Sequence, residues 1–406
     1  MEIRPIISAL MRSKVALVLI GLQIALTLAI VCNSLFIIGQ RLERMNRPSG
    51  MNEADTFWFG STGFGQGFDV KSVQQADLQL LRQLPGVAAA TSVNSVPMSQ
   101  GGWSTGVSLT REQKKENADT AFYLTDAKGL DTFGLKLIAG RNFTPEEVIF
   151  RTMNDRTVPA SVIITEALAK KLFPDGDALG KQAWWDDPET SEKSTIVGIV
   201  ERAQVPWVEA SFVEYSTFAP SYLPYGNSTR YLVRAEPGRR DEVIKTVEQK
   251  LGEANPSRII GKVKTIEQVR SEAYAGDRAM AIILGTVIFL LLTITALGIV
   301  GMASFWVTQR TKQIGTRRAL GATKLDILRY FLTENFLITT AGLILGGVLT
   351  YAFSLWLLAH VDGARLLPWY YVPIGFICLW LLGQLAVLGP ATRASRVPPA
   401  LATRSV

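Results

Sequence analysis

The sequence predicts a membrane α-helical protein with four transmembrane helices and a large α+β extracytoplasmic domain of two lobes, inserted between helices 1 and 2. Four apolar segments are long enough to cross ~30 Å of hydrocarbon as helices. Between the first two lies the segment 41–277, which holds nearly all of the acidic residues. With 48% hydrophobic residues and a mean hydropathy of +0.20, the chain is too apolar for an ordinary soluble protein and too charged to lie wholly in lipid.

The apolar segments fix the order of the predicted parts. Each span must be helical, because lipid offers no water to satisfy backbone groups. The parts expected along the chain are an amphipathic cytoplasmic helix at 1–14, the first span at 15–40, the periplasmic domain at 41–277 with an outer lobe at about 126–225, the second span with a stalk at 278–307, a cytoplasmic loop at 308–330, the third span at 331–358, a periplasmic loop at 359–368, the fourth span at 369–389 and a cytoplasmic tail at 390–406.

The distribution of charge predicts the orientation. Lysine and arginine dominate both termini and the 308–330 loop, which places these parts in the cytoplasm and the 41–277 domain outside. The net charge of +7 is therefore explained without nucleic acid. The apolar core of the first span is too long for a cleavable signal peptide. Both cysteines, Cys32 and Cys378, lie in spans, so we expect the outer domain to hold together without a disulfide.

Local patterns predict several elements of the large domain. Asp69 caps a helix that ends before Pro85, and the spacing of Thr144 and Glu147 indicates a capping box. The glycine- and aromatic-rich segment 57–68 is expected to be a flexible loop. Further predicted elements are strands at 87–96, 194–200, 231–235 and 259–264, helices at 166–173 and 236–251, and a helix that runs without interruption from 265 into the second span.

The basic loop between the second and third spans is the most informative stretch. A helix along the membrane surface is predicted over 319–330, because its apolar residues fall on one face. Glu334, just beyond it, is expected to pair with Arg329 or Arg317 near the membrane interface. By composition alone, the loop could equally be a solvated connection between two spans.

The residues of this loop resemble a known signature. I-G-T-R-R-A-L-G-A-T at 314–323 is similar to the I-G-I-R-R-A-L-G-A signature of the FtsX/MacB-type (type VII) ABC transporter permeases. That family usually has glutamate where this chain has Gln313. The resemblance implies that the loop couples the permease to an ATPase. The implied coupling residues are Gln313, Ile314, Gly315, Arg317, Arg318, Ala319, Leu320, Gly321, Ala322 and Thr323.

Other stretches resemble the same family. Blocks beginning at Gly134, Val162, Ala178 and Ile196 occur in the order of the MacB periplasmic core domain, and the tail from 389 resembles the ending of these permeases. The third span contains closely spaced glycines that let membrane helices approach each other, either within this subunit or against a partner permease. These glycines are Gly342, Gly346 and Gly347.

The motifs of enzymes and cofactor sites are incomplete. The sequence contains no G-x-x-x-x-G-K-[ST], and the glycines at 63–67 lack the context of a nucleotide loop. The G-x-S-x-G match around Ser104 lacks a base, because the only histidine, His360, lies at the end of the third span; a turn is the better interpretation. One histidine and two membrane cysteines do not suit zinc. We therefore expect no catalytic residue, cofactor or metal on this chain, with ATP and Mg on the partner ATPase.

The resemblance implies a permease subunit in the bacterial inner membrane that works by mechanotransmission, most readily in a tripartite efflux system. Its partners would be an ABC ATPase, a second permease of the same or a homologous chain, and a periplasmic adaptor with an outer-membrane channel. Lipoprotein release and regulation of cell-wall hydrolases are the alternatives within the class. From another class, the chain could be a membrane-anchored receptor with no ATPase.

Overall fold

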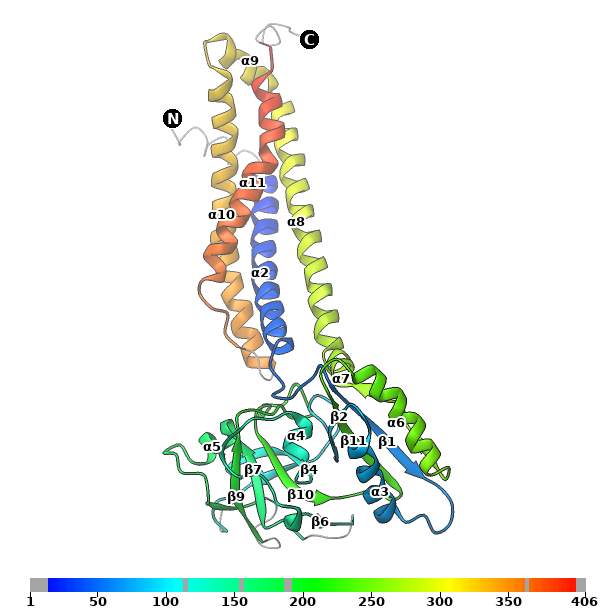
Figure 1. Ribbon diagram of the computed structural model, residues 1–406. Helices are drawn as coiled ribbons and strands as arrows, with labels where there is room; N and C mark the ends of the chain where they lie inside the picture. Colours follow the sequence, from blue (N-terminus) through cyan, green and yellow to red (C-terminus); the bar gives the residue numbers. More distant parts are fainter. Residues whose placement is uncertain (1–13, 112–115, 153–156, 186–191, 362–364, 399–406) are drawn as a thin grey trace. The chain divides into compact units, whose positions relative to one another are not determined.

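A computed structural model describes residues 14–111, 116–152, 157–185, 192–361 and 365–398. The chain divides into two compact units (Figure 1). The membrane unit comprises residues 1–45 and 277–406, and the large unit comprises residues 46–276. The helix expected at 1–14 lies outside the described residues except for its last residue.

The membrane unit is helical, and its four long helices confirm the predicted spans. Each is long and apolar enough to cross a membrane. The fourth continues past the predicted end at 389, through the buried Pro390, because Ala391 and Ala394 pack in the bundle core. The helices of this unit are α2 (Lys14–Met45), α8 (Ala275–Gln309), α9 (Thr311–Ala319), α10 (Lys324–His360) and α11 (Tyr371–Ser395).

Glycines bring α2 and α10 into close contact, and the two helices run side by side (Figure 1). A Cβ atom at Gly342 would lie 2.9 Å from the carbonyl oxygen of Gly21, and one at Gly346 would lie 2.9 Å from the Cα of Ala25. Gly347 faces α11 instead, toward Phe376. Gly342 and Gly346 thus pack within the subunit, the first of the two arrangements considered above.

Helix α8 is packed much less than the other spans. In its most apolar window 11% of residues are buried, against 56% in α2 and 39% in α10. A hydroxyl pair joins its Thr295 to Thr27 of α2 at 2.8 Å, and Gly298 accommodates the side chain of Gln23. Most of the α8 surface therefore remains apolar and uncovered by the other described helices.

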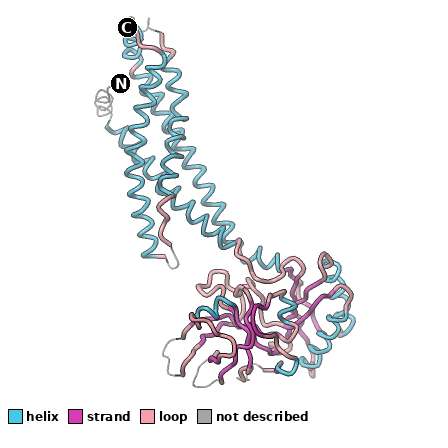
Figure 2. The backbone as a smooth tube through the Cα atoms, turned by 60° about the vertical axis from the view of Figure 1, so that its left-hand side comes forward, coloured by secondary structure: helices cyan, strands magenta, loops and turns pink. Residues whose placement is uncertain are grey.

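The large unit contains two β-sheets with helices on their faces, and Figure 2 shows the strands gathered in this unit. The first sheet has the order β12-β1-β11-β2, with β13 also paired to β1. Its elements are β1 (Thr56–Gly63), α3 (Val70–Gln83), β2 (Val87–Ser92), β11 (Ser228–Ala235), α6 (Arg240–Ala254), β12 (Arg258–Ile260), β13 (Lys264–Thr265) and α7 (Ile266–Ala273).

A loop was predicted at 57–68, and the first sheet overturns this prediction for 57–63, whereas residues 64–68 lie between β1 and α3. Residues Thr56–Gly63 form β1, which is antiparallel to β11 with Phe57 opposite Val233. Alternation explains this, because successive side chains of a strand point to opposite faces. Phe57 and Phe59 are buried in the core with α3 and α6, whereas Trp58 lies on the other face. The helix capped by Asp69 is confirmed as α3.

The second sheet has the order β3-β4-β10-β7-β9-β5, with β6 on β10 and β8 on β9. It begins at Ser104, earlier than the outer lobe expected at about 126–225, because β4 pairs in parallel with β10. Its elements are β3 (Ser104–Val107), β4 (Ala118–Thr125), α4 (Gly129–Phe133), β5 (Leu137–Gly140), η1 (Pro145–Glu147), β6 (Ile149–Phe150), β7 (Ser161–Thr165), α5 (Glu166–Leu172), β8 (Gln182–Trp184), β9 (Lys193–Val200) and β10 (Ser216–Tyr222).

The helix expected to run unbroken from 265 into the second span is instead two helices. Helix α7 ends at Ala273, α8 begins at Ala275, and Tyr274 between them has φ −97° and ψ 13°. The Tyr274 side chain is 1% exposed, and its hydroxyl accepts a hydrogen bond from Nε2 of Gln204 at 2.8 Å. Burial of this side chain in the large unit holds the residue out of helical geometry.

The predicted capping box at Thr144 and Glu147 is confirmed and gives a pH-dependent prediction. Two hydrogen bonds from Arg141, followed by one from the Thr144 backbone, lower the pKa of Glu147 from 4.5 to about 2. This stabilisation is therefore complete above pH 4.5 and lost as the pH falls toward 2. Because Arg141 is half exposed, we expect Glu147→Gln to lower the free energy of unfolding by only about 1 kcal/mol at neutral pH.

Thermal unfolding of the detergent-solubilised chain between pH 7 and pH 2 tests this expectation. Arg141→Gln should produce the same loss, and the difference between either variant and the parent should shrink below pH 4.5. A difference that persists unchanged at pH 2 would contradict the assignment.

Candidate functional site at the loop between α8 and α10

The loop between the second and third spans is a short helix followed by a tight turn. Arg310 is the only residue between α8 and α9, and residues 320–323 separate α9 from α10. Gly321 has φ +100°, a left-handed conformation that glycine adopts without strain. The Thr323 hydroxyl accepts from the backbone N–H of Asp326, whose carboxylate accepts from the N–H of Thr323. This capping box starts α10.

The helix predicted over 319–330 is therefore wrong in its bounds. The helical segment of the loop is Thr311–Ala319, and Lys324 already belongs to the long helix of the third span. The apolar face that suggested a surface helix is instead the buried side of α10, where Ile327 and Phe331 join the bundle core. The T-K-L-D sequence at 323–326 is the local signal that could have located this helix start.

The predicted coupling residues lie together on α9 and on the turn at 320–323, but their environments differ. Ile314 and Gly315 are buried against the bundle. Arg318 donates to the carbonyl oxygen of Ser395, so it ties α9 to the end of α11. The residues left exposed on this surface are Gln313, Arg317, Ala319, Leu320, Gly321 and Thr323, with Ala322 half-buried.

Leu320 is the most unusual of these residues. Its side chain is 83% exposed at the end of α9, although leucine normally avoids water. Arginine and lysine residues surround it in the sequence. An apolar side chain that projects from a short, well-anchored basic helix is suited to enter an apolar pocket on a partner protein.

A buried ion pair connects the start of α9 to α10. Nη1 of Arg310 lies 2.8 Å and 3.0 Å from the two carboxylate oxygens of Glu334, whose side chain is 1% exposed. We expected Glu334 to pair with Arg329 or Arg317. Arg317 instead lies over the ring of Tyr330 at 4.8 Å. The break between α8 and α9 brings Arg310 to the face of α10 that carries Glu334.

The alternative enzymatic site is not supported by the local structure. Ser104 lies in β3, an edge strand that pairs with β4, rather than at the sharp strand-to-helix turn that a nucleophile elbow requires. A turn was predicted at this motif, and this prediction is wrong, because Ser104 begins a strand. Of the glycines considered for a nucleotide loop, Gly63 is the last residue of β1 and packs against Phe68, and the other two follow the strand.

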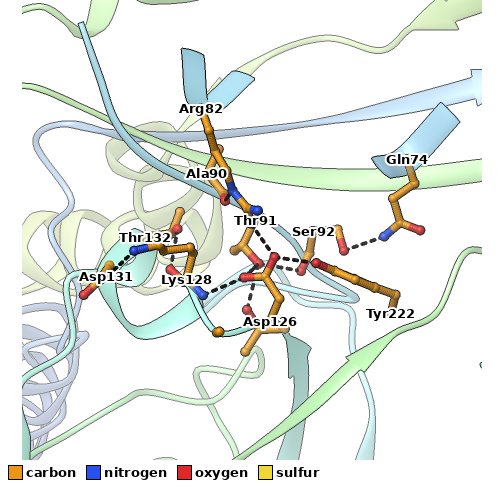
Figure 3. Close-up of polar contacts among 12 residues, drawn as sticks. Gln74, Arg82, Ala90, Thr91, Ser92, Asp126, Lys128, Asp131, Thr132 and Tyr222 are labelled. Atoms are coloured by element: carbon orange, nitrogen blue, oxygen red, sulfur yellow. Dashed lines mark hydrogen bonds and ion pairs between the residues drawn. The ribbon is translucent and has the colours of Figure 1, made fainter. Parts of the chain in front are cut away.

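A second polar cluster, which the sequence did not indicate, joins the two sheets of the large unit (Figure 3). Asp126, at the end of β4, accepts hydrogen bonds from Thr91 of β2 at 2.9 Å and from Tyr222 of β10 at 2.8 Å. Arg82 of α3 pairs with the same carboxylate, and the backbone N–H of Lys128 donates to it. Burial, and then the neighbouring carboxylate, raises the pKa of Tyr222, which keeps its hydroxyl a donor. All these groups satisfy one another, so the cluster is structural.

The fold and the α9 loop define a class: a multi-pass membrane protein with a large α+β domain after its first span. The family model of the MacB-like periplasmic core domain matches residues 16–250, and that of the FtsX-like permease C-terminal domain matches residues 285–399. The chain therefore belongs to the family of ABC transporter permeases with a MacB-like periplasmic core domain, as its motifs predicted. The α9 loop lies within the second match.

The chain is also similar to individual proteins. MacB of Chromobacterium violaceum, a macrolide export ATP-binding/permease protein, is 26% identical over 273 residues, which cover 66% of this chain and 40% of that protein. The ABC transporter permease YknZ of Bacillus subtilis is 23% identical over 304 residues, covering 74% of each protein. The periplasmic region of MacB from Actinobacillus actinomycetemcomitans aligns at 16% identity with a TM-score of 0.34, covering 57% of this chain and 97% of that one. The match to the first relative spans less than half of its length.

Proposed function

We propose that this chain is the non-catalytic permease subunit of an ATP-driven mechanotransmission ABC transporter. In this proposal α9 docks on an ABC ATPase, and the movement driven by ATP passes through the membrane helices to the large domain. Work is then done outside the cytoplasm, in a tripartite efflux system with a periplasmic adaptor and an outer-membrane channel.

The structure of the α9 loop is the observation that carries this proposal. A flexible connection between two spans could not transmit force, whereas α9 is a defined helix with buried contacts and two anchored arginines, Arg310 and Arg318. Its outward surface offers the apolar side chain of Leu320 and the charge of Arg317 to a partner. We assign all ten residues of the predicted coupling set to this element, with Ile314, Gly315 and Arg318 positioning it and the exposed members making contact.

The ATPase is proposed as a partner polypeptide. The sequence contains no phosphate-binding loop of the G-x-x-x-x-G-K-[ST] type, so we place ATP and Mg on that partner. The name of the Chromobacterium relative, an ATP-binding/permease protein, supports an association of this kind of permease with ATP binding.

Two permeases are proposed to pair in the bacterial inner membrane, with both termini in the cytoplasm. The surface of α8, which the other described helices leave largely uncovered, is available for contact with a second copy or a homologous permease. The positive charge of the α9 loop and of the α11 end supports the cytoplasmic assignment.

Replacement of Leu320 by aspartate tests the docking surface directly. We expect Leu320→Asp to reduce recovery of the ATPase in a mild-detergent pull-down at least tenfold, since a charge would have to enter an apolar pocket at a cost of about 2 kcal/mol or more. Because Leu320 is exposed, the fold should be retained. The measurement is mass spectrometry of the proteins that copurify with the full chain.

Ile259→Asp serves as the matched control, because Ile259 is an apolar residue of the large unit that is 66% exposed. It should leave ATPase recovery unchanged. Recovery of an adaptor together with the ATPase supports efflux, whereas an ATPase alone supports lipoprotein release or hydrolase regulation. If no ATPase copurifies with the wild-type chain, the coupling proposal fails and the result favours a membrane-anchored receptor without an ATPase.

A further inference from the structure

The junction of α8 and α9 is tied to α10 by one buried ion pair, Arg310 with Glu334, which we call the ionic anchor. Arg310 is the single residue between the two helices, with φ −101° and ψ 13°. Its guanidinium reaches both oxygens of a carboxylate that is 1% exposed, and it also approaches the hydroxyl of Tyr330 at 3.5 Å. Loss of one partner would leave a buried charge uncompensated, so the pair holds the junction firmly.

The remaining contacts of α9 come from two buried residues and two arginines. Ile314 and Gly315 are its only buried residues among those described. Arg317, which is exposed, rests on the ring of Tyr330. Arg318 holds the far end through a single hydrogen bond to Ser395. The ionic anchor is therefore the contact that fixes where α9 begins relative to α10.

Helix α8 has an ion pair at each end, and only 11% of its most apolar window is buried. At the opposite end of α8, Asp277 is 4% exposed and pairs with Arg41 of α2. Between these two ion pairs, the polar contacts of α8 with α2 are the Thr27–Thr295 hydroxyl pair and the Gln23–Gly298 contact. Ion pairs thus hold α8 at both ends, and Thr295, Ile299, Ala303 and Trp306 are the residues of α8 buried between them.

A small, mainly apolar cavity adjoins the Glu334 side of the ionic anchor. Its volume is about 10 Å³, comparable with one water molecule, and Trp306, Glu334 and Asn335 contribute to its lining. Nε1 of Trp306 and Nδ2 of Asn335 are buried without a partner among the described residues. These two donors and the Glu334 carboxylate form the polar part of the cavity wall.

We propose that the ionic anchor is the joint through which movement of α9 is passed to α8 and α10. Arg310 and Glu334 are then positioning residues, which touch no nucleotide and no cargo. This inference rests on the proposed coupling function. It adds that the coupling helix acts through a specific buried charge pair, whereas Leu320 and the other exposed members of the predicted coupling set, to which Lys312 does not belong, only dock the ATPase.

Hydrogen exchange of the full chain, alone and in complex with its copurified ATPase, tests the proposal. In Glu334→Gln we expect the α9 amides to exchange about tenfold faster or more, because the buried arginine loses its counter-charge. In the wild-type complex, ATP should change exchange in the first turns of α8. In Glu334→Gln, that response should disappear while ATPase recovery and ATP hydrolysis continue.

Two further variants keep the test decisive. Lys312→Gln removes an exposed charge from α9 and should match wild type in both measurements. The exchanged pair, Arg310→Glu with Glu334→Arg, should restore most of the α9 protection and the ATP response of α8. Faster α9 exchange with an intact ATP response in Glu334→Gln would show that the pair is only structural and would overturn the proposal.

Failure of the proposed coupling function can be distinguished from failure of the ionic anchor. If wild-type chain recovers no ATPase, the coupling function fails, and exchange of the isolated chain still measures whether Glu334 holds α9. Equal α9 exchange in Glu334→Gln and Lys312→Gln would then reject the ionic anchor as well.

Discussion

Replacement of Asp77 by alanine is expected to lower the stability of the large unit by about 3 to 5 kcal/mol. Asp77 of α3 pairs with Arg258 of β12, and their side chains are 3% and 1% exposed. The same carboxylate accepts from the hydroxyl of Tyr231 at 2.7 Å, and Arg258 also donates to the carbonyl oxygen of Leu251. Four elements of the first lobe therefore meet at this ion pair.

The expected loss of stability is large because alanine would leave two buried polar groups without their partner. Arg258 would remain buried with its charge unpaired, and Tyr231 would lose its acceptor. Hydrogen exchange in β1 and β11 of the full chain, combined with thermal unfolding in detergent, measures the loss. The double variant Asp77→Leu with Arg258→Met should be more stable than Asp77→Ala, because it removes both charges.

An exposed acid supplies the control for this prediction. Glu253 forms an i,i+3 pair with Lys250 on α6, and both side chains are about half exposed. Glu253→Ala should change stability by less than about 1 kcal/mol. Equal losses in Asp77→Ala and Glu253→Ala would contradict the assigned role of the buried pair.

Alanine at Gly346 is expected to destabilise the membrane unit by about 1 to 3 kcal/mol. Its Cβ atom would lie 2.9 Å from both the Cα and the carbonyl oxygen of Ala25, and 3.0 Å from the Cβ of Leu28. These are backbone or near-backbone atoms of α2, so they cannot move aside as a flexible side chain would. The two helices must separate, and the contacts along their whole interface weaken.

Thermal unfolding of the membrane unit within the full chain measures this effect. Gly342→Ala should act similarly, and the double variant should lose more than either single one, since both glycines face α2. Gly285→Ala is the control, because a Cβ atom there meets nothing within 4 Å and alanine favours a helix. A neutral Gly346→Ala would mean that α2 and α10 are not closely packed.

The sequence predicted correctly those elements that depend only on residues close together in the chain. The four spans follow from the length of their apolar runs, and α3 follows from a capping aspartate and a proline-glycine stop. The family was predicted from short sequence motifs and from their order along the chain. The prediction failed for β1, because its glycines suggested a loop, whereas its pairing partner β11 lies far along the chain.

Within the candidate site, the sequence located the loop but not its geometry. Composition and motif indicated residues 313–323, yet the helix lies earlier than expected and Glu334 pairs with an unexpected arginine. The helix break at Arg310 decides which of the nearby arginines reaches the carboxylate of Glu334. That break depends in turn on the packing of Ile314 and on the capping box at Thr323.

Near-neighbour chemistry in the sequence thus determined the spans, the helix caps and the family of this protein. The tertiary structure alone decided the buried charge pairs, because their members lie 24 residues apart in the ionic anchor and 181 apart in the Asp77–Arg258 pair. A buried charge is stable only beside its partner, and the chain brings those partners together only when it folds.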